Sequence, residues 1–242
     1  MKRVRLGKTD MYVNAIGLGC MGLTHASGLP TPKEEAVEIL RKAHDMGYDF
    51  YDTAECYTGV NPDGSTAYNE EVVGEAVKPF RKDIILCTKF GVKHMGDHLE
   101  FDSSPSTISK CPRLELGITY VAFSPLANEA LTGAYQSKKA FGSGEQDFRP
   151  DMPQYSEEGI KKTNELLEVV SQIGEKHHAT NAQMSLAWMI NKYDFIIPIP
   201  GSRKLDRLQS NFEAGNVELG QEEVKTIDDK LNTMEFKVFG GH

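Results

Sequence analysis

The sequence predicts one α/β domain, residues 1–242, with a parallel sheet at its centre. Short apolar runs rich in β-branched and aromatic residues alternate with segments whose apolar residues recur at helical spacing. The short runs are predicted strands, and they comprise residues 13–18, 48–53, 83–88, 118–123 and 194–199. They are mostly apolar on both faces, which is typical of parallel strands covered by helices on both sides. This order of elements occurs either in an open doubly wound sheet or in a barrel.

The predicted helices lie between these strands and after them. The clearest covers residues 32–47, because it has a proline at its start, acidic residues in its first turn and a glycine at its end. The other predicted helices comprise residues 69–80, 156–178, 180–192 and 221–233. Residues 128–155 are rich in glycine, serine and proline and lack clear periodicity, so we expect a lid or a disordered loop there.

Composition and charge argue against several classes of partner. The chain has 242 residues, 39% of them apolar, which suits one domain, and its formal net charge of −8 disfavours nucleic acid or an anionic membrane. No stretch approaches about 18 apolar residues, and the first residues lack the apolar run of a signal peptide, so a cytoplasmic location is expected. The cysteines are scattered without a metal-binding spacing, so we expect reduced thiols and no metal site; they are Cys20, Cys56, Cys87 and Cys111.

Residues 17–22, GLGCMG, match the G-x-G-x-x-G pattern of dinucleotide-binding loops, and Asp52 follows the next predicted strand as a ribose-binding acid would. In that fold the third glycine opens a helix whose amino terminus contacts the pyrophosphate. Here residues 24–31, THASGLPT, separate the motif from the next helix, and Asp52 lies about thirty residues beyond the motif rather than about twenty. We therefore interpret the glycines as a tight turn between a strand and a helix.

Three polar residues at the ends of predicted strands form a candidate catalytic site. Asp52 ends the second strand, Tyr57 follows it by five positions, and Lys89 comes directly after the third strand. Because parallel strands end at the same edge of a sheet, these side chains should converge. The Lys89 ammonium would favour the phenolate and lower the pKa of Tyr57, while Asp52 would hold the lysine in place. The set suits protonation of a carbonyl oxygen; the alternative is a turn cap, a half-exposed ring and a solvated lysine without function.

The chain resembles the aldo-keto reductases, which are NADPH-dependent enzymes built on a TIM-type (β/α)₈ barrel. The resemblance rests on motifs that occur in the family's order and together cover most of residues 2–233. They are LGCMG, YDFYDTAECY, NEEVVGEAV, TKFG, FSPLANEALTGAY, NAQMSLAWMI and IPIPGSRKLDRLQSN. The resemblance implies a carbonyl reductase that transfers hydride from NADPH to an aldehyde or ketone.

The resemblance also implies roles for individual residues. Tyr57 would be the proton donor, and Lys89 and Asp52 would tune it. The nicotinamide would lie near Cys20, Met21 and Asp52, and it would stack on Phe123. The pyrophosphate would lie along Ser124, Pro125, Leu126 and Ala127, under the long loop. The 2′-phosphate would be held by Gly201, Ser202, Arg203 and Arg207, and the adenine by Gln209 and Asn211.

The basic cluster supports a phosphate ligand on physical grounds as well. Arg203 and Arg207 are four positions apart, so in a helix they would form a like-charge pair that is unfavourable unless an anion bridges them. Arginine and lysine donors at the exit of a strand suit a phosphate group. NADPH is therefore expected in preference to NADH.

The sequence departs from the family's pattern in its middle. Residues up to Lys110 follow the first three βα units, whereas residues from about Pro112 follow the seventh and eighth. A full barrel has eight units, so about three, on the order of 90 residues, are absent near 110–112. The absent units would contain a histidine, a serine–asparagine pair and a glutamine. In the family these residues orient the substrate and the nicotinamide. A segment could be missing from this sequence, the deletion could be natural, or a partner chain could complete the barrel.

Two functions therefore remain open. The first is NADPH-dependent reduction of a small carbonyl substrate, and the second is NADPH binding with little or no turnover, as in the family's potassium-channel β relatives. His94 and His98 follow Lys89 in sequence, but Gly96 separates them and the glutamate of an HExxH metal motif is absent, so we expect a surface loop there. We therefore expect no local histidine to replace the absent one.

Overall fold

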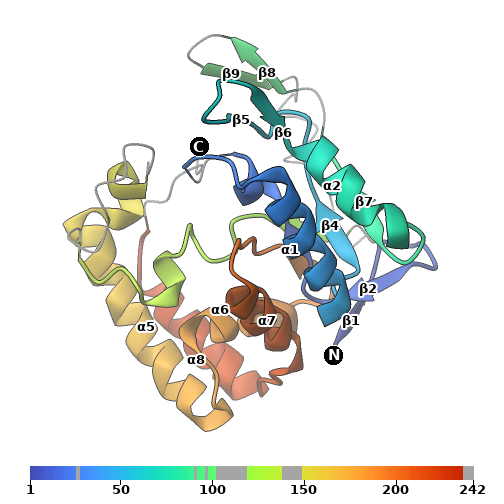
Figure 1. The fold of residues 1–242 in the computed structure, drawn as a ribbon. Helices are drawn as coiled ribbons and strands as arrows, with labels where there is room; N and C mark the ends of the chain where they lie inside the picture. Colours follow the sequence, from blue (N-terminus) through green and yellow to red (C-terminus); the bar gives the residue numbers. More distant parts are fainter. Residues whose placement is uncertain (26–27, 90–91, 96–97, 102–118, 138–148, 237–242) are drawn as a thin grey trace.

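The computed structural model describes residues 1–25, 28–89, 92–95, 98–101, 119–137 and 149–236 (Figure 1). The chain starts with an antiparallel hairpin of β1 (Arg3–Arg5) and β2 (Tyr12–Asn14), in which Val4 lies opposite Val13. The predicted strand 13–18 is therefore wrong as one element. Its first residues belong to this hairpin, and the chain then enters β3 (Leu18–Gly19).

The central strands are parallel, as the sequence predicts. β3 pairs with β4 (Phe50–Asp52), and β4 pairs with β7 (Ile85–Cys87). β10 (Tyr120–Ala122) pairs with β11 (Ile196–Pro198), with Tyr120 opposite Ile196. Each of the last four strands lies within a predicted strand, because apolar runs of this length are buried on both faces of the sheet.

The two parallel sets meet between β11 and β3. The backbone nitrogen of Gly17 donates to the carbonyl of Pro198 at 3.0 Å. Glycine allows this approach, because a Cβ on Gly19 would lie 2.6 Å from the Ile199 carbonyl oxygen and one on Gly201 would lie 2.5 Å from that of Gly19. The strands thus lie in the order β10, β11, β3, β4, β7, with a backbone contact but no described ladder between β11 and β3, and this order matches a barrel whose last strand lies beside its first.

The barrel is incomplete. Among the described residues, β7 pairs only with β4 and β10 only with β11, so no ladder joins the two outer strands. The predicted fold class, a TIM-type (β/α)₈ barrel with about five of its eight βα units, is confirmed. The predicted discontinuity at 110–112 lies outside the described residues.

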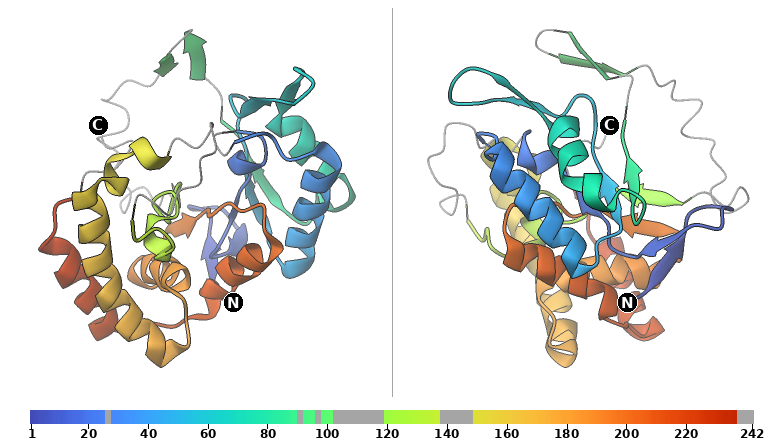
Figure 2. Two further views of the ribbon diagram at one scale, coloured as in Figure 1. Left: turned by 60° about the vertical axis from the view of Figure 1, so that its left-hand side comes forward. Right: turned by 45° about the vertical axis from the view of Figure 1, so that its right-hand side comes forward.

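The helices expected from the sequence match their predicted ranges to within a few residues, and the structure adds a helix over residues 205–213 that has no predicted range. α1 (Lys33–Met46) ends at Gly47, whose φ of 110° is the left-handed conformation that glycine favours at a helix end. The others are α2 (Asn69–Val77), α5 (Glu157–His177), α6 (Asn181–Lys192), α7 (Leu205–Glu213) and α8 (Gln221–Asn232). Figures 1 and 2 show α1 and α2 on one side of the molecule and α5 and α8 on the other. No described helix is long and apolar enough to cross a membrane.

Two apolar clusters hold these elements together. The larger joins the strands to α1, α2, α6 and α7, and its fully buried members include Phe50, Tyr51, Leu186 and Leu208. The second lies between α5, α6 and α8 and includes Leu166, Val170, Met184 and Ile227. Each such side chain contributes about 1.5–3 kcal/mol on burial. The packing therefore fixes the strand ends from which the polar residues project.

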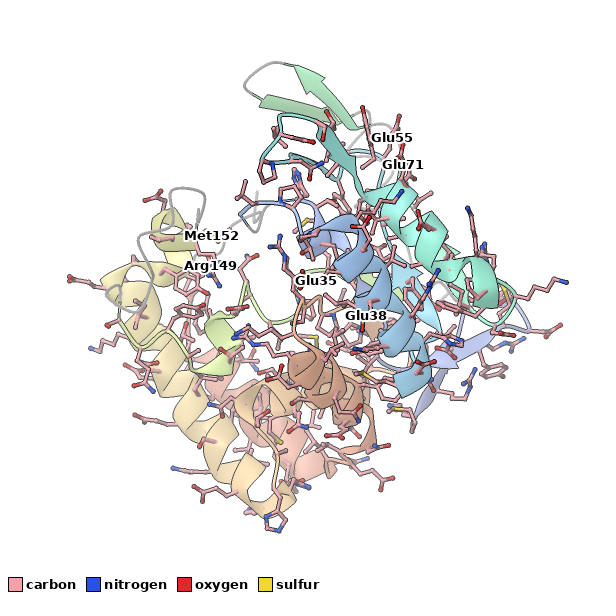
Figure 3. The ribbon with its side chains drawn as sticks, viewed as in Figure 1. Glu35, Glu38, Glu55, Glu71, Arg149 and Met152 are labelled. Carbon is pink, nitrogen blue, oxygen red and sulfur yellow. The ribbon has the colours of Figure 1, made fainter. Side chains whose placement is uncertain are left out.

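Several segments differ from expectation. Residues 58–60 and 66–68 form a hairpin of β5 (Thr58–Val60) and β6 (Thr66–Tyr68). The region expected to be a surface loop around His94 and His98 forms a second hairpin, β8 (Val92–Met95) with β9 (His98–Phe101). The described parts of 128–155 form short 3₁₀ turns, namely Ala130–Thr132, Arg149–Asp151 and Pro153–Tyr155. Figure 3 shows Arg149 and Met152 beside the start of α5, where Met152 and Tyr155 are buried with Ile160.

Candidate active site

The structure brings Asp52, Tyr57 and Lys89 together beyond the ends of β4 and β7. The Lys89 ammonium forms an ion pair with Asp52 and donates to the Thr53 carbonyl oxygen at 2.9 Å. The same nitrogen lies 4.7 Å from the centre of the Tyr57 ring. Asp52 is 6% exposed, so the lysine links a buried carboxylate to the phenol.

Burial dominates the electrostatics of this group. It raises the pKa of Tyr57 above its ordinary value, although the Lys89 ammonium opposes the rise. The expectation that Lys89 would lower this pKa overall is therefore wrong, because desolvation of the phenolate outweighs the charge. For Lys89, burial lowers the pKa, but Asp52 and Tyr57 together raise it. Burial raises the pKa of Asp52, and the hydrogen bond from Lys89 opposes that change.

Asn69 fixes the backbone around Tyr57, a role that sequence reasoning missed. Its side chain is 1% exposed and donates to the Cys20 carbonyl at 2.9 Å and to the Thr24 hydroxyl at 2.8 Å, while it accepts from the Thr53 hydroxyl at 2.6 Å. The Asn69 backbone nitrogen donates to the Tyr57 carbonyl at 3.1 Å. Asn69 therefore joins the loop after β3, the end of β4 and Tyr57.

We expect Asn69→Ala to lower the free energy of unfolding by roughly 2–5 kcal/mol, because it leaves three buried polar groups without their partner. Urea denaturation followed by circular dichroism measures this difference. The matched control is Asn216→Ala, since Asn216 is exposed and surface substitutions usually change stability by less than about 0.5 kcal/mol. Equal losses in the two variants would contradict the assigned role of Asn69.

Arg203 is held against the loop that follows β3. Its Nε donates to the carbonyl of Gly22, and Nη1 donates to that of Leu29 at 3.0 Å. Nη2 is buried and has no hydrogen-bond partner among the described residues. Burial lowers the pKa of Arg203, opposed by Glu35 on α1. A buried guanidinium donor without an acceptor fits an anionic ligand such as a nucleotide phosphate.

Arg207 makes a different contact from the one expected. It lies on α7 and forms an ion pair with Glu129 at 2.8 Å, whereas Arg203 precedes that helix. The two arginines are thus not a like-charge pair within one helix, and that part of the sequence argument is wrong. Glu129 also binds Arg149 at 2.7 Å and Tyr135 at 2.9 Å. This cluster connects the segment after β10 to α7.

The segment after β10 has an unusual backbone. Phe123 is 68% exposed, so its ring is free of protein cover on much of its surface. Four non-glycine residues that follow have positive φ angles, namely Ser124 (46°), Ala127 (50°), Asn128 (56°) and Glu129 (79°). Each costs on the order of 1–3 kcal/mol, and such strain is concentrated at ligand sites. Pro125 is buried, and Leu126 packs against the main core.

The remaining predicted cofactor residues lie on the same strand ends or on α7. Cys20 is buried, and burial raises the pKa of its thiol to about 12. Met21 begins a 3₁₀ turn, and Ser202 accepts from the Lys204 backbone nitrogen at 3.0 Å. Asn211 is buried, and Gln209 pairs with Glu213 along α7 at 2.8 Å.

The comparisons with known proteins agree on one family. The sequence model described as the aldo/keto reductase family matches residues 15–111 and 102–232, two stretches that meet near the predicted discontinuity. An aldo-keto reductase of Schizosaccharomyces pombe, named with NADP(+), is 27% identical over 315 residues, which cover 92% of this chain and 90% of the relative. Aldo-keto reductase str7 of Strobilurus tenacellus is 26% identical over 306 residues, covering 89% and 88%.

Both alignments are longer than the 242 residues of this chain, so each relative has residues without a counterpart here. Among solved structures, a glycerol dehydrogenase from Gluconobacter oxydans has a TM-score of 0.75 at 16% identity, covering 96% of this chain and 95% of its own. An aldo-keto reductase from Bacillus halodurans has a TM-score of 0.66 at 18% identity, covering 100% and 99%. These structures share the fold, and the family match extends over most of the sequence. The chain therefore belongs to the aldo/keto reductase family.

Proposed function

We propose that this protein reduces the carbonyl group of a small aldehyde or ketone with NADPH. The observation that carries the proposal is the placement of Lys89 between the buried Asp52 and the ring of Tyr57. NADPH, when bound, would supply the hydride for the carbonyl carbon. Tyr57 would donate its proton to the carbonyl oxygen as negative charge develops there.

The electrostatics of the site support this division of roles. Because burial raises the pKa of Tyr57, the phenol keeps its proton at neutral pH and is ready to give it up. Once the proton has left, the adjacent Lys89 ammonium stabilises the phenolate. Asp52 keeps Lys89 charged and in place, since the ion pair opposes the effect of burial on the lysine.

The chain's own residues also suit the cofactor. Arg203 would bind the 2′-phosphate through Nη2, which has no partner in the described part of the chain. Phe123 would stack on the nicotinamide, since its ring is exposed at the end of β10. Ser124 to Ala127 would lie along the pyrophosphate, where the positive φ angles of Ser124 and Ala127 redirect the backbone.

The open sheet favours a second candidate function, NADPH binding with little turnover. The described residues contain no strand that joins β7 to β10, and the family residues that orient the substrate would lie on such strands. Misplacement of reacting groups by about 1 Å can cost roughly a hundredfold in rate. A partner chain that pairs with β7 or β10 would restore that support.

One pair of measurements separates the two functions. Titration of the full chain with NADPH, followed by nucleotide fluorescence, measures binding, and loss of NADPH absorbance with propanal as substrate measures reduction. Binding together with oxidation supports the reductase. Binding without oxidation of NADPH sinks the reductase and leaves the binding function. Absence of binding contradicts both.

A further inference from the structure

His25 lies beside Tyr57, although it is far from it in sequence and the motifs do not include it. The two rings stack with their centres 5.9 Å apart and their planes 20° from parallel. His25 follows the short 3₁₀ turn Met21–Leu23 in the loop after β3. The side-chain hydroxyl of its neighbour Thr24 donates to the Tyr57 carbonyl at 3.1 Å, so a hydrogen bond as well as the ring contact holds this loop against Tyr57.

The protonation of the neutral ring follows from its hydrogen bond. Nδ1 of His25 lies 2.7 Å from the carbonyl oxygen of Thr58. A carbonyl oxygen only accepts hydrogen bonds, so Nδ1 carries the hydrogen and donates it. Nε2 of the neutral ring is then a hydrogen-bond acceptor, and within the described part of the chain it makes no hydrogen bond.

Near Tyr57, two other described polar side chains already have partners. Asp52 forms an ion pair with Lys89, and the side-chain oxygen of Asn69 accepts a hydrogen bond from the Thr53 hydroxyl. Two other described histidines have partners elsewhere: His44 stacks on Phe80 and His177 binds Glu223. A ligand that reaches Tyr57 therefore lies beside the partly exposed ring of His25, whose Nε2 has no hydrogen-bond donor in the described part of the chain.

We propose that His25 contacts the substrate and accepts a hydrogen bond from a hydroxyl group next to the reacting carbonyl. The preferred substrates are then hydroxy aldehydes and hydroxy ketones rather than plain carbonyl compounds. This inference rests on the proposed reductase function, because it places the carbonyl oxygen at Tyr57. A site that pairs with a substrate hydroxyl discriminates against the analogue without it, since a desolvated polar group would be left unpaired.

The test compares two aldehydes that differ in hydroxyl groups, glyceraldehyde and propanal, with NADPH as cofactor. In the unaltered chain, kcat/KM should be higher for glyceraldehyde. His25→Phe keeps a ring beside Tyr57 but removes both nitrogens, and it should lower the ratio of kcat/KM for glyceraldehyde to kcat/KM for propanal about tenfold, the effect of one lost hydrogen bond.

Two further variants separate the two nitrogens. His25→Asn retains a donor near the position of Nδ1 and should behave like His25→Phe on glyceraldehyde. His25→Gln places an amide near the position of Nε2 and should recover much of the preference. An equal loss for both aldehydes in His25→Phe would show a structural role and overturn the proposal. Reduction of both aldehydes at unchanged rates would also overturn it while leaving the reductase function intact. No reduction of either aldehyde by the unaltered chain would instead contradict the reductase function itself.

Discussion

Tyr57→Phe should lower kcat for aldehyde reduction by roughly 10²–10⁴-fold, the usual contribution of a positioned general acid. The ring and its contacts with His25 and Lys89 remain in this variant, and only the hydroxyl is lost. Steady-state oxidation of NADPH with propanal measures the change. Because the hydroxyl acts in the transition state, KM for the aldehyde should change much less than kcat.

Two controls define what this loss means. NADPH affinity from fluorescence should be unchanged, since the residues proposed to bind the 2′-phosphate follow β11 and those proposed to bind the pyrophosphate follow β10. The unaltered chain should also show a pH limb set by the phenol. Because burial raises the pKa of Tyr57 above its ordinary value, the protonated form persists through neutral pH, and the rate should fall only in the alkaline range where the phenol loses its proton. Unchanged turnover in Tyr57→Phe would contradict the proton-donor assignment.

Arg203→Ala should weaken NADPH binding by about tenfold to a hundredfold, because one charge-assisted contact contributes roughly 1.5–3 kcal/mol. Affinity for NADH should change little, since NADH lacks the 2′-phosphate. Fluorescence titration with both nucleotides measures the two dissociation constants in the same variant. The NADH value thus serves as an internal control for loss of the bonds from Arg203 to Gly22 and Leu29.

Arg207→Ala is the matched comparison for Arg203→Ala. Arg207 is about half exposed and already paired with Glu129, so a phosphate would have to compete with that carboxylate. We expect a smaller loss of NADPH affinity than for Arg203→Ala. A larger loss would show that Arg207, rather than Arg203, is the main ligand of the phosphate.

Features that depend on local patterns of residues could be predicted from the sequence. The strands β4, β7, β10 and β11 lie inside predicted runs, because a buried parallel strand needs apolar residues on both faces. The meeting of Asp52 and Lys89 was predictable for a related reason. Asp52 ends β4 and Lys89 comes just after β7. These two strands are parallel neighbours, so they end at the same edge of the sheet.

The features that sequence reasoning missed depend on contacts distant in the chain. Asn69 and Cys20 are 49 positions apart, and His25 meets Thr58 across 33 positions. An asparagine at a helix start and a histidine in a turn are common in protein sequences and indicate no particular role. Only the folded structure shows that both lie beside Tyr57. The predicted direction of the pKa shift of Tyr57 is wrong for a similar reason. The charge of Lys89 can be read from the sequence, but the burial of Tyr57 cannot.

The backbone contact between the β11 and β3 segments has a consequence for how the chain folds as it is made. Arg203 and Gly22 are 181 positions apart, so β3 can meet its C-terminal neighbour only on a ribosome that has already made most of the chain. At a synthesis rate of about 5–20 residues per second, one edge of β3 remains uncovered for on the order of ten seconds or more. During that interval an apolar strand edge is exposed, and chaperone binding to nascent chains should be strongest then.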